Sequence, residues 1–481
     1  MPRLIGLIPA AGKGTRAYPY THEVPKGMLP INGRPNIEHL IRRMRDQLRI
    51  REIYVVTGHL GPVIRDYCRD GSQWGVAITY LENTAIQRGW AHSVLLGREH
   101  IRDHFCVMLS DECYVGTNHD ALLDSGYQDA LAVCAVTPVD DRRRIRKNYA
   151  VEVDKGRITR LVENPRDLTN NLLGLGTFIL SPRIFNIIAR AYDDAPPGEV
   201  DLISLLGRAC GAGEVIKPFV INGHYVNIND RDSLQLAKYY VRRELGAKAS
   251  TGVLIYSEGG EPDLPFTLDQ YLALRHLSEV LVVLPNGAST RKIERKDPRL
   301  TLLNCPPGVD LYGEKIKYGL DRLSADILAI TEASYSFHRR DLAKLEAYIR
   351  EADMVIGTRT TRQLIEQGAS MRGVVRWANM LLAKLLEQLW RPMDCRFTDV
   401  GCTFRALWRT SYLRIRDHLS APGPEFSVQM ITELLRAREH IIEIPVSYYG
   451  RSYAMYGKYQ NVRTFRRMLK AILDSRTRRP R

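Results

Sequence analysis

The sequence predicts an α/β protein with two Rossmann-like domains, each a mainly parallel, mixed sheet flanked by helices. The chain has 481 residues, which is more than one hydrophobic core usually holds. Short apolar runs alternate with helical patterns, as they do in β-α-β units. The same alternation begins again after a charged stretch near the middle of the chain. We therefore expect one domain over residues 1–248 and a second over residues 249–481.

The elements of the first half follow from its hydrophobic periodicity. An apolar run at residues 4–9 is typical of a buried parallel strand. Helical spacing of apolar residues follows over residues 37–48, and further apolar runs occupy residues 53–57 and 105–109. Strands and helices that alternate in this way place the helices on the faces of a parallel sheet.

The second half repeats this pattern after a helix end. A charged helical stretch around residues 240–244 stops at Gly246, and an apolar strand begins at residue 252. This change places the domain boundary near residue 248. The expected elements beyond it are strands over residues 280–284, 326–330 and 354–357 and a helix over residues 312–323.

The composition is that of a soluble globular protein, with 44% hydrophobic and 26% charged residues. We find no run of about 18 apolar residues and no signal-peptide pattern, so we expect a cytoplasmic protein. The eight cysteines are scattered without a metal-ligand spacing, which favours reduced thiols. The net charge is +15 and the C-terminal tail is basic, but no nucleic-acid-binding module accompanies this charge. We therefore expect no nucleic acid partner.

The loop after the first strand has the residues that a phosphate-binding turn needs. Small residues let the backbone turn tightly and present its N–H groups to an anion. Arg16 ends this loop, and Lys26 follows ten residues later, so two cations can converge on a triphosphate. The residues expected to bind the phosphates are Ala10, Ala11, Gly12, Gly14 and Thr15.

From residue 4 to about residue 237 the sequence resembles the sugar-phosphate nucleotidyltransferase family. The resemblance rests on the loop ending in Gly14-Thr15-Arg16 and on Pro25-Lys26. Further matching segments occur in the expected order at residues 110–112, 162–165, 171–178 and 226–229. The family resemblance implies that a phosphorylated small molecule attacks the α-phosphorus of an NTP and that pyrophosphate leaves.

The family resemblance also assigns roles to individual residues. It implies that Asp111 and Asn227 hold Mg²⁺ against the nucleotide phosphates, a role that suits hard oxygen ligands. On the residues alone, Asp111 could equally cap the following turn. Arg16 and Lys26 would neutralise charge in the transition state. By the same resemblance, Gly89 belongs to the nucleotide site and Glu163 and Asn171 to the substrate site.

The identity of the substrate stays open between several classes. Family members usually have E-K-P, in which the Lys contacts the sugar phosphate, where this chain has Glu163-Asn164-Pro165. The phosphate loop is most similar to that of uridylyltransferases, whereas residues 34–38 resemble cytidylyltransferases that act on phosphocholine, related phospho-alcohols or phosphonates. A pyrimidine nucleotide is favoured. For Trp90 two roles stay open: the side chain shapes the nucleotide pocket, or it only packs in the hydrophobic core.

The second half carries a further set of motif-like segments, at residues 372–379, 399–405, 443–446, 451 and 457–458. Through these segments the chain from residue 357 onward resembles family-two glycosyltransferases, especially the dolichyl-phosphate mannose synthase type with its GT-A fold. The resemblance implies that Asp399 is an acid or base beside the acceptor. It also implies that Arg405, Arg451 and Lys458 face phosphates of the donor or of a lipid acceptor.

Two carboxylate pairs of active glycosyltransferases are missing from this half. D-D-G-S is replaced by residues 284–287, and D-x-D by residues 331–334, where Glu332 is the one acid that survives. A lone carboxylate is a poor metal site. The domain is therefore either a transferase with altered donor binding or a degenerate domain retained for binding.

A leucine-rich helical pattern over residues 374–390 is typical of a core face. If the acceptor is a polyprenyl phosphate, this pattern and the basic tail are where the protein would meet lipid, peripherally at the inner membrane face. The leading hypothesis is a bifunctional enzyme whose first domain activates a sugar or phospho-alcohol and whose second domain transfers the activated group. The rival hypothesis is a nucleotide-sugar sensor or scaffold without turnover.

Overall fold

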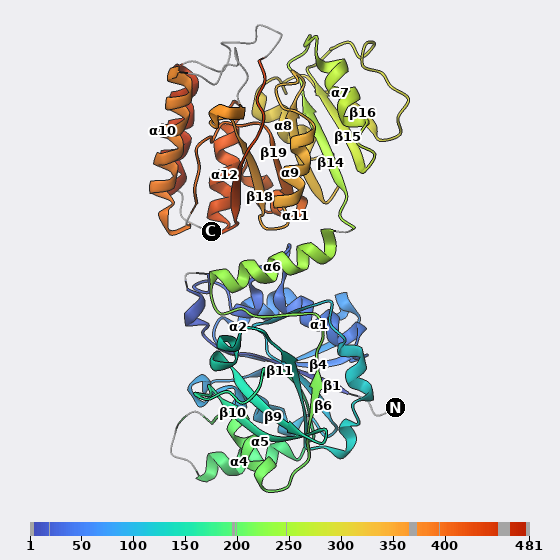
Figure 1. Cartoon of the computed structure of the whole chain (residues 1–481), viewed down its shortest axis with the longest axis vertical. Helices are drawn as coiled ribbons and strands as arrows, with labels where there is room; N and C mark the ends of the chain where they lie inside the picture. Colours follow the sequence, from blue (N-terminus) through green and yellow to red (C-terminus); the bar gives the residue numbers. More distant parts are fainter. Residues whose placement is uncertain are drawn as a thin grey trace. The chain divides into compact units, whose positions relative to one another are not determined.

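The computed structural model describes residues 4–18, 20–194, 198, 200–246, 248–364, 373–393, 395–450 and 462–477. The chain divides into two compact units, unit 1 (Met1–Val241) and unit 2 (Arg242–Arg481). The division falls inside helix α6 (Arg231–Gly246), and the predicted boundary near residue 248 follows the end of this helix. Figure 1 shows a helix-flanked sheet in each unit.

Unit 1 is built on a nine-stranded mixed sheet. Its parallel part consists of β1 (Ile5–Ala10), β4 (Glu52–Thr57), β5 (Ala77–Glu82) and β6 (Phe105–Met108). The central strand β1 is buried along its whole length, as expected for the apolar run that opens the sequence. The remaining strands are β8 (Ala132–Pro138), β9 (Tyr149–Asp154), β10 (Arg157–Glu163), β11 (Leu172–Leu180), which is antiparallel to β6, and β12 (Ile216–Val220).

Two short strand pairs and the helices complete unit 1. The pair β7 (Glu112–Val115) and β13 (His224–Asn227) is antiparallel and brings together residues far apart in sequence. The helix predicted over residues 37–48 is α1 (Asn36–Asp46), which buries Ile37, Leu40, Ile41 and Met44 at helical spacing. The other elements are β2 (Pro30–Ile31), β3 (Arg34–Pro35), α2 (Gly61–Cys68), α3 (Trp90–Leu95), α4 (Ile184–Asp194) and α5 (Leu202–Gly211).

Unit 2 is built on a seven-stranded mixed sheet with the order β16-β15-β14-β17-β19-β18-β20. Its strands are β14 (Thr251–Tyr256), β15 (Leu277–Leu284), β16 (Leu300–Asn304), β17 (Ile327–Glu332), β18 (Met354–Thr358), β19 (Arg405–Trp408) and β20 (Ile441–Pro445). Its helices are α7 (Leu264–Leu272), α8 (Tyr312–Leu320), α9 (Arg340–Tyr348), α10 (Gly373–Leu389), α11 (Arg409–Ile415), α12 (Phe426–Arg436) and α13 (Val462–Thr477).

The two sheets share a strand order. In unit 1 the central strand β1 has β4 and β5 on one side, and on the other side the parallel strand β6 followed by the antiparallel strand β11. In unit 2 the central strand β14 has β15 and β16 on one side, and on the other side the parallel strand β17 followed by the antiparallel strand β19. This arrangement confirms the predicted fold class of two Rossmann-like α/β domains. It also creates a topological switch point beside each central strand, where α/β sheets usually bind ligands.

The leucine-rich helix predicted over residues 374–390 corresponds to α10. Leu382 and Leu386 belong to the core of unit 2, and Leu385 and Leu389 pack against it. Leu381 departs from the predicted core face, because its side chain is 63% exposed. Among the described residues, no helix is long and apolar enough to cross a membrane.

Candidate active site

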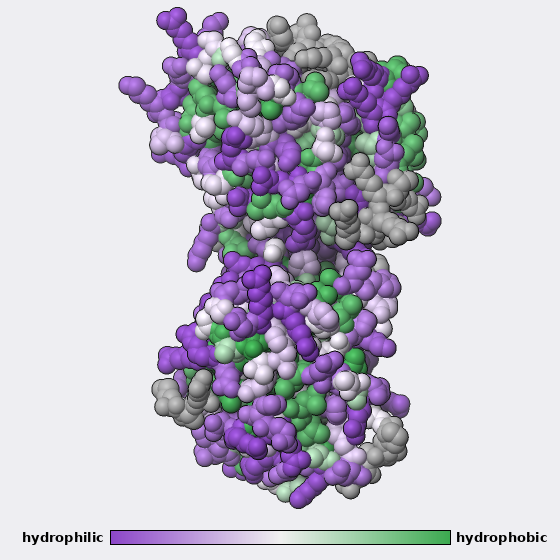
Figure 2. Space-filling model, turned by 180° about the vertical axis from the view of Figure 1, so that it is seen from behind, coloured by the Kyte–Doolittle hydropathy of each residue, from purple (hydrophilic) through white to green (hydrophobic). Residues whose placement is uncertain are grey.

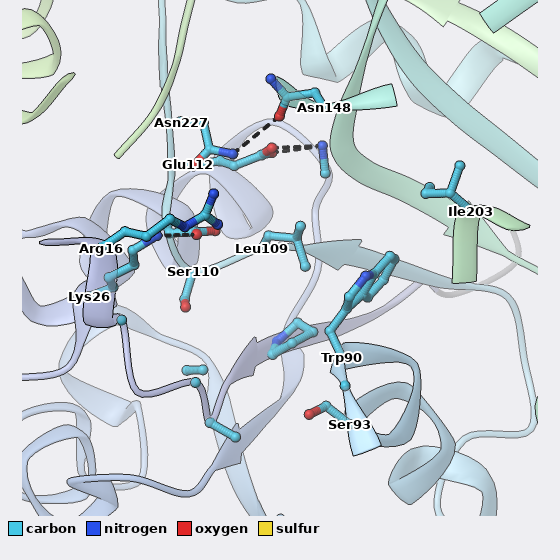
Figure 3. Close-up of a pocket in the computed structure, with 18 of the residues that line it drawn as sticks. Arg16, Lys26, Trp90, Ser93, Leu109, Ser110, Glu112, Asn148, Ile203 and Asn227 are labelled. Carbon is cyan, nitrogen blue, oxygen red and sulfur yellow. Dashed lines mark hydrogen bonds and ion pairs between the residues drawn. The ribbon is translucent and has the colours of Figure 1, made fainter. Parts of the chain in front are cut away.

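A cavity of about 450 Å³ lies in unit 1 where the parallel strands β1 and β6 end. Ala10 closes β1 and Ser110 follows β6, so both strand ends contribute to its wall. In the view of Figure 3, Arg16 and Lys26 lie on one side of the cavity and Trp90 and Ile203 on another. The cavity therefore occupies the switch point of the sheet, the position at which this class of fold usually binds ligands.

The predicted phosphate loop forms one wall of this cavity. Ala10, Ala11, Gly12, Gly14 and Thr15 all line it. Gly14 has a φ of 64°, in the left-handed region that favours glycine. A Cβ atom at this position would also approach Lys26 Cγ to 2.9 Å. The loop therefore packs directly against the side chain of the second predicted cation.

Lys26 is held by two acceptors at the cavity wall. Its Nζ donates to Asp111 Oδ2 at 2.9 Å and to Asn229 Oδ1 at 2.8 Å. An ammonium group has three N–H donors, so one remains for a ligand. Arg16 lines the same cavity and is exposed. The structure thus brings both predicted cations to one site and adds Asn229, to which the sequence pattern assigned no role.

Asp111 and Asn227 also meet at this site. Ile228 N donates to the backbone oxygen of Asp111 at 2.8 Å, which fixes the end of β13 beside the turn after β6. Asn227 Nδ2 donates to Asn148 Oδ1 at 3.3 Å. Asn227 Oδ1 is buried and has no hydrogen-bond partner among the described residues.

This oxygen pair fits the predicted Mg²⁺ role in its chemistry. One carboxylate and one unsatisfied amide oxygen are hard ligands, and Mg²⁺ commonly takes its remaining ligands from phosphates and water. In the part of the chain that the structure describes, no group of three or more His, Cys, Asp and Glu side chains could hold a metal without such help. The two predicted ligands therefore suit a metal that arrives with a nucleotide.

Glu112 is a buried acid in the cavity wall that the sequence pattern did not single out. Gly176 N donates to both of its oxygens, at 2.9 and 2.8 Å, and Tyr225 Oη donates to Oε1 at 2.6 Å. Tyr114 donates a further short hydrogen bond. Burial raises the pKa of Glu112 to about 7, although the hydrogen bonds from Tyr114 and Tyr225 favour its ionised form. Its position directly after Asp111 is the one signal that could have indicated it.

The far end of the cavity is more apolar. Gly89, at the N-terminal cap of α3, and Trp90 both line it. Trp90 stacks on Phe178 with ring centroids 5.7 Å apart, so this tryptophan shapes the pocket and packs at once. Glu163 lines the cavity as predicted, whereas Asn171 does not and instead accepts a hydrogen bond from Val139 N through its backbone oxygen.

Comparison with known proteins assigns this half of the chain to a family. Residues 5–234 match the family model described as nucleotidyl transferase. Over 232 residues the chain is 30% identical to a UTP–glucose-1-phosphate uridylyltransferase from Haloferax volcanii, which covers 48% of this chain and 94% of that protein. The chain belongs to the nucleotidyl transferase family.

Other relatives of this nucleotidyl transferase carry related names. A bifunctional protein GlmU from Methanococcus maripaludis is 28% identical over 224 residues, which are 46% of this chain and 50% of that protein. A glucose-1-phosphate thymidylyltransferase from Streptomyces griseus is 27% identical over 220 residues, covering 46% of this chain and 61% of that protein. The chain thus spans about half the length of the GlmU relative.

Among solved structures, apo UDP-glucose pyrophosphorylase matches with a TM-score of 0.44 and 23% identity, over 50% of this chain and 99% of that chain.

Unit 2 of this nucleotidyl transferase places Asp399 in its interior. The Asp399 side chain is fully buried, and Arg359 binds both of its oxygens, at 2.7 and 2.8 Å. Asn379 donates a further hydrogen bond to it. Burial alone would raise the pKa of Asp399, but the Arg359 guanidinium holds it below the ordinary value. The structure therefore places this carboxylate in an internal ion pair with Arg359, and its acid or base role stays a prediction.

Arg405 also points into the protein. It is 1% exposed, and its guanidinium donates to the backbone oxygens of Cys402 and Ser427. These carbonyl groups take donors of Arg405 inside the core, and its predicted contact with a phosphate stays a prediction. Arg451 and Lys458, which are likewise predicted to face phosphates of the donor or of a lipid acceptor, fall outside the described residues.

Proposed function

We propose that unit 1 transfers the nucleotidyl group of a pyrimidine NTP to a sugar phosphate and releases pyrophosphate. The observation that carries this proposal is the convergence of Lys26, Asp111 and Asn227 under the glycine-containing loop of one cavity. The uridylyltransferase and thymidylyltransferase relatives, both named for glucose 1-phosphate and a pyrimidine nucleotide, support the substrate class.

The residues of this cavity supply positioning and charge neutralisation. The loop backbone and Arg16 bind phosphate oxygens, and the free N–H of Lys26 donates to the triphosphate as negative charge moves toward pyrophosphate. Asp111 and Asn227 would hold Mg²⁺, which when bound neutralises phosphate charge. The attacking sugar phosphate is already ionised, so the reaction needs no general base.

The residues at the substrate end of the cavity are also compatible with substrates other than sugar phosphates. Asn164, which stands where family members usually carry a lysine, lies outside the cavity lining. Arg16 and Lys26 are accordingly the cations that line the described cavity, and both lie at its phosphate-loop side. Phosphocholine-like alcohols and phosphonates are therefore kept as alternative substrates of the same site, with CTP as the nucleotide.

The test is pyrophosphate release by the full chain with Mg²⁺, each NTP in turn, and a panel of sugar phosphates, phosphocholine and aminoethylphosphonate. We expect release with a pyrimidine NTP and a sugar 1-phosphate. Asp111→Ala should abolish it, whereas the exposed Asp120→Ala on the same unit should not. Release from no pair in the panel, by protein that remains folded, would refute the proposal.

For unit 2 we infer ligand binding rather than a second transfer step. The support comes from Asp399, whose carboxylate is paired with Arg359, and from the sequence at the end of β17, where Glu332 is the one acid in place of the expected carboxylate pair. The bifunctional alternative predicts that the sugar moves from the unit 1 product to a polyprenyl phosphate or another acceptor. Mass spectrometry of the reaction with such an acceptor distinguishes the two, because a glycosylated acceptor would overturn the binding proposal.

A further inference from the structure

Exposed apolar side chains gather on two helices of unit 2. Among the described large hydrophobic residues, the three most exposed are Val462 on α13, at 67%, and Trp377 and Leu381 on α10, at 63% each. Single exposed apolar residues are ordinary on protein surfaces. A concentration of the most exposed ones on two elements calls for a partner that covers them.

The two helices lie side by side and run in the same direction. At one end, Trp390 Nε1, just past α10, donates to Ser475 Oγ of α13 at 3.1 Å. Further toward their N-termini, an added Cβ at Gly401 would meet Asn379 of α10 at 3.5 Å and Met468 of α13 at 3.6 Å. The N-terminal halves of both helices, which carry the exposed apolar residues, therefore lie next to each other.

Both helices turn their opposite sides toward the same core. Leu382 and Leu386 of α10 and Ile472 of α13 belong to one hydrophobic cluster. Both helices therefore turn their exposed residues away from the same core.

The exposed side of α13 is strongly basic. Its exposed residues Arg463, Arg466, Arg467 and Lys470 follow helical spacing and lie on one face, and Asp474 is the acid that shares this face. Along the edge of unit 2 where α10 lies, Figure 2 shows strongly hydrophilic side chains beside hydrophobic ones. Apolar side chains and cations are thus presented together.

We propose that this α10/α13 face, made by Trp377, Leu381, Val462 and the basic residues Arg463, Arg466, Arg467 and Lys470, docks on an anionic lipid bilayer surface. Tryptophan and leucine insert at the level of the lipid headgroups, and arginine and lysine are attracted to anionic lipids. Charge complementarity thus favours a lipid surface. The docking goes beyond the proposed function, because it requires no reaction in either unit.

Vesicle flotation with the purified full chain tests this face. We expect the protein to float with vesicles of phosphatidylcholine and phosphatidylglycerol and to stay behind with phosphatidylcholine alone. Trp377→Ser combined with Leu381→Ser should weaken binding on the order of tenfold. Arg466→Gln combined with Arg467→Gln should weaken it on the order of 30-fold, and high salt should do the same.

Matched variants on other surfaces of unit 2 control for charge and for apolar area. Arg291→Gln with Lys292→Gln removes two exposed cations, and Phe266→Ser with Leu413→Ser removes two exposed apolar groups. All four double variants should keep the wild-type unfolding temperature. Flotation that does not depend on phosphatidylglycerol, or that the control variants weaken equally, would overturn the proposal. Self-association that is lost in the Trp377 and Leu381 variant, without flotation of the wild type, would also overturn it, because a second copy would then be the partner.

Discussion

Glu112 should make the stability of unit 1 depend on pH near neutrality. Its carboxyl group is fully buried against Gly176, Tyr114 and Tyr225, and burial raises its pKa to about 7 from an ordinary value of 4.5. The folded state therefore holds the proton more tightly than the unfolded chain does. The resulting stabilisation is present below about pH 4.5 and is lost as the pH rises through about 7.

The size of this effect follows from the difference between the two pKa values. A pKa of about 7 in place of 4.5 corresponds to about 3 kcal/mol of unfolding free energy that is lost once the carboxyl ionises. In Glu112→Gln the amide imitates the protonated acid and does not titrate. The free energy of unfolding of wild type minus that of the variant should therefore fall by about 3 kcal/mol between about pH 4 and pH 8.

Pulse proteolysis in urea measures the unfolding free energies of wild type and Glu112→Gln. Mass spectrometry of the peptides from each unit makes the measurement specific to unit 1. Glu99→Gln, which removes an exposed carboxyl group from the same unit, is the matched control and should show no such fall. A difference between wild type and Glu112→Gln that stays flat across this pH range would refute the assignment of a buried, neutral Glu112.

Three other substitutions test the packing and the site. Arg359→Met should destabilise unit 2 by roughly 3–5 kcal/mol, because it leaves Asp399 charged and buried, and adding Asp399→Asn should recover part of the loss in urea denaturation. Gly174→Ala should destabilise unit 1 by roughly 1–3 kcal/mol, because the added Cβ would come within 2.0 Å of the Tyr149 ring. Gly211→Ala is the control and should be tolerated, because a Cβ at that position meets no atom within 4 Å. Asn227→Asp should lower the Mg²⁺ concentration that gives half-maximal pyrophosphate release, by adding a charged oxygen ligand, whereas the exposed Asn222→Asp should leave that concentration unchanged. An equal or higher Mg²⁺ requirement in Asn227→Asp would contradict the ligand role.

Local patterns were enough to predict many of the residues that line the cavity of unit 1. The strand β1, the loop that follows it and Lys26 lie close in sequence, so periodicity and small residues indicated them. Asn229 and Glu112 were missed because their roles come from tertiary contacts: Asn229 reaches Lys26 from the far end of the domain, and Glu112 is defined by the burial around it.

Unit 2 shows the limit of motif spacing more clearly. Residues 399–405 fit the expected pattern, but the pattern contains no information about Arg359, whose side chain neutralises Asp399 from another strand end. Likewise, helical spacing placed Leu381 with the leucines of a core face, although it lies beyond the edge of the buried stripe. Whether a charge is catalytic or internal depends on its partners, and these are set by the fold.

The ion pair between Lys26 and Asp111 has a consequence for the order in which ligands arrive. While Lys26 is bonded to Asp111, the carboxylate is already neutralised, and a small cation arriving alone meets a competing positive charge. Under the proposed function, a triphosphate that also accepts from Lys26 would weaken this ion pair and make Asp111 more available to a cation. Nucleotide binding and cation binding at this site would then be thermodynamically linked, each strengthening the other by the same factor.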